Sequence, residues 1–339
     1  MAAGRALARV AGRALGTRAP FHLEATVRVL QRRPENRLDL WDQDRYLRVL
    51  TVADVCVLVE VRNRGTIDTP DLRFSVLSGR LTATALPRLR RTLRRVLGLD
   101  LDPCLLRRRV ERVPALRAAA YALRGLRPPR FVDLFEAFVR VVPFQQMSLE
   151  AGVAITGRLI ERFGESIHHD GRCFHAFPTA RRIAHARAPT LRACGLSAAK
   201  AQTLRHVAQA LESGELDEDS IARMPTAAAL QKLTELPGIG PWSAALVLLR
   251  GFGRLDVFPP GDVGATRGLS ALLRLAPGAP LGRAIERFGD LRGYLYFYNL
   301  GVSLLNKGLI DRELKKELTG LDLEPGMAKG AEMGAPGGN

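Results

Sequence analysis

Lysine, aromatic side chains and long apolar runs are all scarce in this chain of 339 residues. Aromatic residues make up 6% of the sequence, and only six of its 51 basic residues are lysines. No apolar run reaches the roughly 18–20 residues that a membrane-spanning helix needs. These shortages predict a protein without a membrane span, whose positive charge is carried almost entirely by arginine.

Cysteine is also sparse, since the sequence holds only Cys56, Cys104, Cys173 and Cys194, far apart from one another. Such scattering favours free thiols in a reducing compartment, so we expect a cytoplasmic protein. Residues 1–19 carry small residues and arginines but no acid. We expect them to form a disordered basic arm, with an organellar transit peptide as the alternative.

The balance of charge points to a polyanionic partner. The formal net charge is +17, while 47% of the residues are hydrophobic, as in an ordinary soluble globule. Arginine suits bidentate phosphate contacts, although an arginine-rich genome would give the same bias. The length favours two domains over one.

Residues 20–103 are typical of a small mixed α+β domain. Apolar residues at helical spacing predict a helix at Leu23–Leu30. Strands separated by Asp, Asn, Gly and Pro turns are predicted at Tyr46–Leu50, Val55–Val61 and Leu72–Leu77. A helix follows at Leu86–Leu97, whose five arginines either contact phosphates or form a solvated face.

The sequence changes to an all-helical pattern from about residue 104, which predicts a helical domain over 104–310. Ser197 and Thr226 stand where helix caps belong. The residues after 310 are predicted to be a helix end and a disordered tail, 311–339. Helices are predicted at Phe131–Val142, Ser148–Phe163, Thr179–Ala186, Ser197–Leu211, Thr226–Leu236, Trp242–Gly251, Val263–Leu275, Leu281–Phe288 and Leu291–Lys307.

The most informative motif is the Leu-Pro-Gly-Ile-Gly-Pro-Trp-Ser-Ala stretch at Leu236–Ala244, a short turn between two apolar helices at 226–251. The first turn of the second helix offers unpaired N–H groups and the positive end of the helix dipole. Pro241 suits the first helical position, where an N–H has no partner. This turn predicts a phosphate-binding site formed by Pro237, Gly238, Ile239, Gly240 and Ser243.

A lone acid, Asp262, follows Gly240 by 22 positions at the end of a segment rich in Gly and Pro. A carboxylate at a fixed distance from a bound phosphate can stabilise the positive charge that builds on C1′ when an N-glycosidic bond breaks. The same residue is well placed to cap the helix that begins at Val263, and the two roles are compatible. We interpret Asp256, the other acid of the loop, as a structural cap.

The Leu236–Ala244 and Asp256–Asp262 segments together resemble the helix-hairpin-helix, Gly/Pro-rich loop and aspartate superfamily of DNA glycosylases, and most of all its AlkA type (3-methyladenine DNA glycosylase II). The resemblance extends over residues 20–307. It implies a mainly α fold with an N-terminal α+β domain like half of a TATA-binding fold. It also implies duplex DNA with damaged bases as partner, a monomer, and a nucleoid-associated location. Further similar segments are Pro143–Ser148, Phe177–Thr179, Leu191–Leu196 and Phe288–Asn299.

The resemblance also implies roles for single residues. Asp262 is the expected catalytic residue, and Gln146, with Met147 beside it, is expected to fill the gap that an everted nucleotide leaves. Trp242 and Tyr294 are expected to line the base pocket, where aromatic rings can select a cationic alkylpurine, with Tyr296 and Tyr298 as further candidates. The best-known relative has further pocket aromatics where this chain has Leu246, Val263 and Leu291, which predicts a wider or less cation-selective cavity.

Two absences bear on mechanism. Superfamily members that also cut the strand place a lysine where Trp242 stands, and no lysine occurs between Lys232 and Lys307. We therefore expect a monofunctional enzyme. No cysteine follows Cys194, so we expect no iron–sulfur cluster and no other cofactor. The 168–175 segment contains three histidines and a cysteine but lacks a second pair of ligands, so we expect no metal there either.

The sequence leaves three functions open. The first is a base-excision repair glycosylase that hydrolyses alkylated purines from duplex DNA. The second is a glycosylase for deaminated or etheno bases (hypoxanthine, uracil or ethenoadenine). The third is a non-catalytic DNA-binding protein that uses the hairpin to hold phosphates. Asp262 distinguishes the first two from the third, because a pure binding protein needs no carboxylate there.

Overall fold

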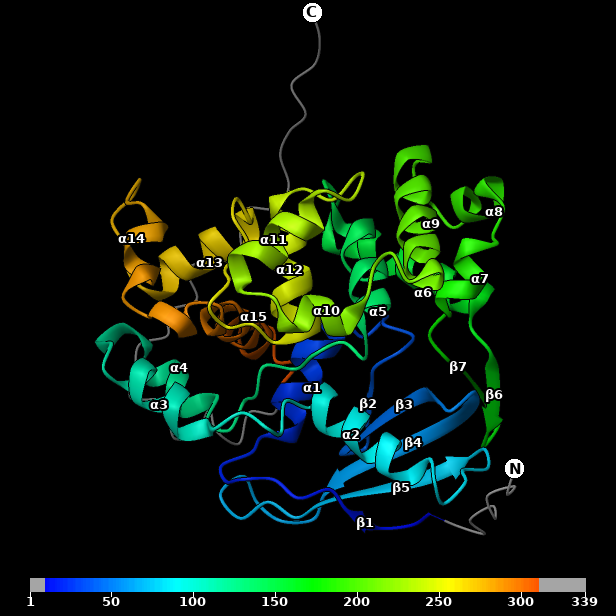
Figure 1. Ribbon diagram of the computed structural model, residues 1–339. Helices are drawn as coiled ribbons and strands as arrows, with labels where there is room; N and C mark the ends of the chain where they lie inside the picture. The colour runs from blue at the N-terminus through cyan, green and yellow to red at the C-terminus, as the bar shows by residue number, and fades with distance from the viewer. Residues whose placement is uncertain (1–9, 311–339) are drawn as a thin grey trace, which may run out of the picture.

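A five-stranded antiparallel sheet forms the base of the molecule, in the order β1-β5-β4-β3-β2 (Figure 1). The computed structural model describes residues 10–310. Tight turns with positive φ at Gln43–Asp44 and Ala53–Asp54 join successive strands, as two-residue hairpins require. The strands are β1 (Arg13–Ala14), β2 (Leu40–Asp42), β3 (Arg45–Val52), β4 (Val55–Asn63) and β5 (Leu72–Ser78).

Residues 10–19 belong to this fold, which corrects the predicted disordered arm over this stretch. β1 pairs with β5, and Leu15 is fully buried. The Val76 N–H donates to Val10 O and the Leu15 N–H to Leu72 O. Apolar burial and backbone pairing therefore hold the segment against the sheet edge, whereas residues 1–9 of the predicted arm lie outside the described residues.

Both faces of the sheet are covered. Tyr46 and Val59 on one face join the main core, together with α1 (Leu23–Gln31) and α2 (Leu86–Val96). On the other face Leu47 and Leu58 pack with Phe174, which belongs to a hairpin that descends from the helical region (Figure 1). That hairpin is formed by β6 (Ser166–His169) and β7 (Arg172–His175).

The hairpin overturns the prediction that the chain is all helical after residue 104. Asp170 and Gly171 connect its strands, and both have positive φ. Asp-Gly is a strong turn signal between strands, but the flanking strands are too short and polar for their periodicity to predict them. The predicted metal-free segment 168–175 is this hairpin, and the residues of the structure that are described include no cluster of His, Cys, Asp and Glu fit to hold a metal ion.

The helical region lies above the sheet, and α1 passes between the sheet and α15 (Figure 1). None of the described helices is both long and apolar enough to cross a membrane. The helices of this region are α3 (Pro103–Glu111), α4 (Arg117–Ala122), α5 (Leu134–Val139), α6 (Leu149–Phe163), α7 (Ala180–Ala184), α8 (Ala188–Ala193), α9 (Ala198–Ser213), α10 (Glu218–Arg223), α11 (Thr226–Thr234), α12 (Pro241–Val247), α13 (Val263–Leu272), α14 (Leu281–Glu286) and α15 (Tyr294–Asn306).

The predicted helices exist, and their ends are set by local chemistry. Ser148 and Ser197 cap α6 and α9 by accepting the N–H three residues on. Thr226 is no cap, because Pro225 occupies that position and the Thr226 hydroxyl accepts from Arg254 instead. The helix predicted at 242–251 ends at Val247 and continues as a π-helical turn, Leu248–Phe252.

A network of buried charges joins the sheet to the helical region. Arg48 on β3 donates to Asp39 at 2.8 Å and to Glu136 on α5 at 2.5 Å. Arg140 donates to the same two carboxylates at 2.5 and 3.1 Å, and Tyr46 donates to Asp39. All five side chains are almost fully buried. Burial alone would raise the pKa of Asp39, but Arg48 and Arg140 outweigh it and hold the pKa below its usual value.

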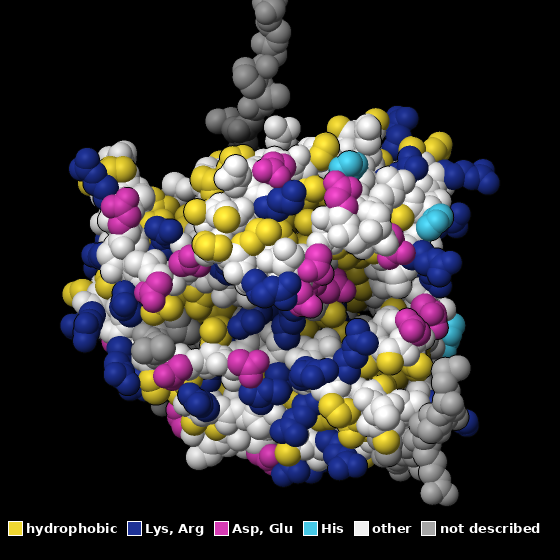
Figure 2. All heavy atoms as spheres, viewed as in Figure 1, with side chains coloured by type: hydrophobic (Ala, Val, Ile, Leu, Met, Phe, Trp, Pro, Cys, Tyr) yellow, Lys and Arg dark blue, Asp and Glu magenta, His cyan; other side chains and the backbone are white. Residues whose placement is uncertain are grey.

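The arginines of α2 divide into two groups. Arg94 donates to the carbonyls of Leu15 and Gly16, and Arg95 donates to Phe131 O and Gly251 O, so both hold the fold together. Arg88, Arg90 and Arg91 are exposed. Figure 2 shows basic side chains gathered over this lower part of the molecule. Phosphate contact by the exposed group stays a prediction.

Candidate active site

The hairpin between α11 and α12 is held in a tight turn. Gly238 has φ +81°, and a Cβ there would lie 2.0 Å from the Thr203 hydroxyl on α9, so only glycine fits. Leu233 and Ile239 are buried on its inner side, while Pro237, Gly238, Gly240 and Pro241 are exposed. The turn therefore presents backbone to solvent while its apolar side chains anchor it.

Several donors of the turn are free. The N–H groups of Gly238, Gly240, Trp242 and Ser243 donate to no atom within residues 10–310. The Ile239 N–H already donates to Leu236 O. Ser243 is buried and its hydroxyl accepts from Gln145, so only its backbone N–H is available for the predicted phosphate contact. Phosphate binding by this turn remains a prediction, with the Ile239 N–H and the Ser243 side chain removed from it.

Gln145 ties the hairpin to the segment predicted to enter DNA. Its side-chain amide donates to Gly238 O at 2.8 Å and to the Ser243 hydroxyl at 2.9 Å. Its carbonyl accepts from Lys200 on α9 at 2.6 Å. The next residue, Gln146, has φ +51° and is exposed, as is Met147. Gln146 and Met147 thus protrude from a fixed turn beside the hairpin, a position compatible with the predicted wedge.

The loop between the π turn and α13 is fixed by hydrogen bonds to its backbone. Arg254 reaches back to α10 and α11, donating to Ile221 O at 2.8 Å and Met224 O at 2.7 Å. Arg292 donates to Asp256 O, and the Gly293 N–H to Leu255 O. No described helix begins at Asp256, so the prediction that it is a helix cap is wrong.

Asp262 is held by both of its carboxylate oxygens. Oδ1 accepts the Ala265 N–H at 2.8 Å, which makes Asp262 the N-cap of α13. Oδ2 accepts the indole N–H of Trp242 at 3.1 Å. The carboxylate is half-buried, so it is fixed in direction yet open to a ligand. The cap role predicted for Asp262 is confirmed, and Trp242 gains a positioning role that the sequence did not reveal.

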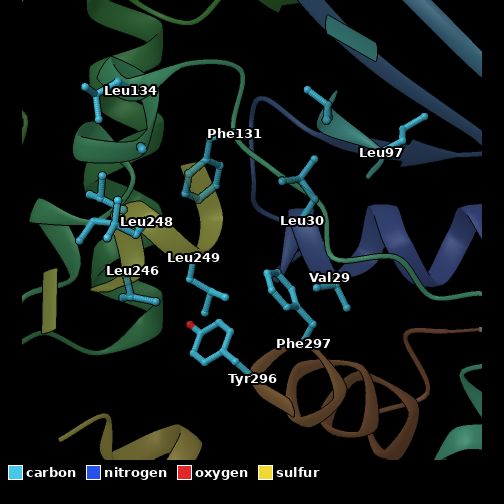
Figure 3. Packing of buried hydrophobic residues seen from close by; sticks show 14 of the residues in the cluster. Val29, Leu30, Leu97, Phe131, Leu134, Leu246, Leu248, Leu249, Tyr296 and Phe297 are labelled. Carbon is cyan, nitrogen blue, oxygen red and sulfur yellow. The ribbon is translucent and has the colours of Figure 1, made fainter. Parts of the chain in front are cut away.

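Asp262 and Trp242 stand at the edge of a cavity of about 150 Å³. Benzene binds in a cavity of this size, so at least one ring of a purine base fits inside it. Met147 and Leu246 also line it, as does Tyr296, whose ring meets Leu249 in Figure 3. Val263, by contrast, is 70% exposed.

Tyr294 does not line this cavity, which corrects its predicted place in the pocket. Its ring is buried against Tyr298 with centroids 4.7 Å apart, and its hydroxyl donates to Leu126 O. Burial raises the pKa of Tyr294 well above its usual value. Residues 294 and 298 share one face of α15, whereas Tyr296 projects from another and takes the pocket position.

Comparison with known proteins identifies the family. The model of the HhH-GPD superfamily of base excision DNA repair proteins matches residues 139–287, and that of the AlkA N-terminal domain matches residues 13–133. Residues 139–287 therefore form a domain of the HhH-GPD superfamily. The predicted fold, a helix-hairpin-helix domain preceded by a small α+β domain, is thereby confirmed, and the hairpin and Asp262 both lie inside the HhH-GPD match.

Three relatives illustrate the similarity. A probable bifunctional transcriptional activator/DNA repair enzyme AlkA of Mycobacterium tuberculosis is 34% identical over 172 residues, 50% of this chain and 34% of that protein. DNA-3-methyladenine glycosylase 2 of Escherichia coli is 35% identical over 148 residues, 44% of this chain and 51% of that protein. A solved 3-methyladenine DNA-glycosylase from Archaeoglobus fulgidus is 25% identical with a TM-score of 0.70, covering 87% of this chain and 97% of that one. The chain thus spans about a third and about half of the length of these two curated relatives.

Three arginines complete the HhH-GPD pocket, and sequence reasoning missed all of them. Arg32, Arg140 and Arg250 line the same cavity as Asp262. Arg32 follows the last residue of α1, Arg140 follows α5, and Arg250 lies in the π turn. The only signal in the sequence is that Arg250 is a charged residue at the end of an otherwise apolar helix. The spacing of the apolar residues does not predict that its side chain lies in a pocket.

Proposed function

We propose that this protein is a monofunctional DNA glycosylase of base-excision repair that hydrolyses the N-glycosidic bond of alkylated purines in duplex DNA. The observation that carries the proposal is the Asp262 carboxylate, which is fixed by Trp242 and by the first turn of α13 and lines a cavity of about 150 Å³. The names of the relatives from E. coli and A. fulgidus support the substrate class.

In the proposed reaction, Asp262, the hairpin and Gln146 each have one role. When the C1′–N bond breaks, its electron pair leaves with the base and positive charge builds on the deoxyribose. Asp262 stabilises that charge and orients the water that adds to C1′. The free N–H groups at Gly238–Ser243 hold a nearby phosphate, and Gln146 fills the gap in the helix. We assign no step to a cofactor or metal, and we propose that a monomer acts on the DNA.

The direct test is excision from duplexes that each carry one defined lesion: 3-methyladenine, 7-methylguanine, hypoxanthine, ethenoadenine or uracil. We expect release of free alkylated base and an abasic site, identified by mass spectrometry. A protein that binds these duplexes with strong salt dependence but releases no base would be a DNA-binding protein only, and the proposal would fall.

The absence of strand cleavage gives a second expected result. Trp242 cannot form a Schiff base, and the described lysines, Lys200, Lys232 and Lys307, do not line the cavity. Borohydride added during turnover should therefore trap no covalent protein–DNA complex, as seen on a denaturing gel. Efficient trapping would refute the monofunctional mechanism while leaving base excision in place.

A third expectation concerns the wedge. Gln146→Ala should lower kcat/KM on duplex DNA about ten-fold, because part of the cost of unstacking the nucleotide is no longer offset. The fold should not change, since Gln146 is exposed. Gln43→Ala is the matched control, because Gln43 is also exposed with positive φ but sits in a turn of the sheet. Equal activity of the two variants would remove Gln146 from the site.

A further inference from the structure

The arginines of the pocket differ in how their charge is balanced. Arg140 is paired with Asp39 and Glu136 and also donates to Leu30 O. Within residues 10–310, Arg32 and Arg250 form no ion pair. Asp39 and Glu136 are already paired with Arg48 and Arg140, so the charge of Asp39 acts on Arg250 without an ion pair between them. The pocket thus holds two uncompensated guanidinium groups against the single carboxylate of Asp262.

Arg250 is the more unusual of the two, because it is 3% exposed. Its guanidinium makes one long hydrogen bond, from Nη2 to Val29 O at 3.4 Å, and its Nε has no partner. Phe131 lies under it with 4.7 Å from the guanidinium carbon to the ring centroid, and Arg140 lies 4.6 Å from the same centroid. A guanidinium has five N–H donors, so most of those of Arg250 are unmatched.

A buried guanidinium group is energetically costly unless hydrogen-bond acceptors or a counter-charge satisfy its donors. Burial, with Arg32 and Arg140 nearby, lowers the pKa of Arg250 to about 9, so the side chain is still a cation at neutral pH. It lines the cavity in which an everted base would lie. An acceptor atom on that base would satisfy donors that the protein leaves open, whereas a positively charged base would be repelled.

We propose that Arg250, assisted by Arg32, makes this pocket selective for neutral damaged bases that carry a hydrogen-bond acceptor, over cationic N-alkylpurines. The inference rests on the proposed glycosylase activity and specifies its substrate class. Ethenoadenine, a neutral adduct with ring-nitrogen acceptors, is the alkylation-derived lesion that fits. Hypoxanthine, with its carbonyl oxygen, fits by the same chemistry.

The bond-breaking step explains why a cationic side chain such as Arg250 would help in the base pocket. A cationic alkylpurine leaves as a neutral base and needs little help. A neutral base leaves with the electron pair of the C1′–N bond and so becomes an anion, which takes a proton from solvent while hydroxide from the water joins C1′. Arg250 keeps its own proton and stabilises that anion by hydrogen bonding, an interaction that is stronger in the transition state than in the ground state.

The test compares kcat/KM for ethenoadenine, hypoxanthine and 7-methylguanine duplexes between the unaltered protein and Arg250→Met. Met fills a similar length without charge, and replacing a poorly paired buried charge by an apolar side chain preserves folding in comparable sites. We expect the unaltered protein to favour the two neutral lesions. Arg250→Met should lose about ten-fold to a hundred-fold on them, the size of a hydrogen bond to a charged group, and should excise 7-methylguanine faster, because the repulsion between Arg250 and the cationic base is removed.

Two further variants separate the causes. Arg250→Lys keeps the charge without the planar fork and should retain an intermediate preference. Arg90→Met removes an exposed arginine of α2 outside the cavity and should leave the preference unchanged. If Arg250→Met lowers excision of all three lesions equally, or if the unaltered protein prefers 7-methylguanine, the selectivity inference is wrong while the glycosylase proposal stands. If no lesion is excised, both fall.

Discussion

Replacing Asp262 with Asn should reduce base excision about a thousand-fold or more while DNA binding is retained. In the proposed mechanism the substitution removes the negative charge that stabilises the positive deoxyribose, which is the largest contribution proposed for any single side chain. Asn is as good an N-cap as Asp, so α13 should still begin at Val263. Single-turnover excision and fluorescence anisotropy on the same lesion duplex measure the two effects separately.

Asp256→Asn is the matched control for this experiment. Asp256 lies in the same loop, but it does not line the cavity, and only its backbone carbonyl takes part in holding the loop. Its substitution should leave excision within about two-fold, in line with an ordinary surface change. If Asp262→Asn kept a tenth of the activity or more, the carboxylate would not be the catalytic group.

Arg48→Met should destabilise the protein by about 3–5 kcal/mol. Arg48 lies between Asp39 and Glu136, and its removal leaves two buried carboxylates with Arg140 alone. Breaking a buried pair by removing one partner costs this much because a charge is left without compensation. Thermal unfolding should show a fall in Tm on the order of 10 °C at pH 7.

The pH dependence of that loss follows from Asp39. Because its pKa is lowered in the folded protein, its ionised form contributes stability at pH values above about 4, and that contribution is lost as the pH falls through the lowered pKa. Arg45→Met provides the comparison on the same strand. Arg45 forms partly exposed pairs with Glu60 and Asp42, so its loss should cost no more than about 1 kcal/mol. Equal losses for the two variants would contradict the role given to the buried network.

Local sequence signals were sufficient for the hairpin and for Asp262. Three residue types each have one dominant structural role here: glycine where the backbone closely approaches a neighbouring group, proline at the first helical position and an acid at a loop–helix junction. The structure confirms these roles for Gly238, Pro241 and Asp262. The sequence also predicted the strands β3 to β5, because turn residues separate the apolar run of each strand from the next. These features depend on neighbours within a few positions.

The pocket was harder to predict because it depends on contacts between distant segments. Periodicity separates Tyr296 from the Tyr294 and Tyr298 pair, but it does not say which face of α15 meets the cavity. Arg32 and Arg250 are brought together only when α1 packs beside the π turn. The sequence does not distinguish Gln145 from Gln146, because only the folded structure shows that the Gln145 side chain bonds to the hairpin.

The π-helical turn at Leu248–Phe252 sets the direction of Arg250 and of the chain that leads to Asp262. A π turn holds one residue more than an α turn, and each residue of an α-helix rotates the next by roughly 100°. Deleting one residue there would restore the regular helix and swing both the Arg250 side chain and the start of the loop that carries Asp262. Chain length at this single turn therefore couples the direction of the Arg250 side chain to the position of the Asp262 carboxylate.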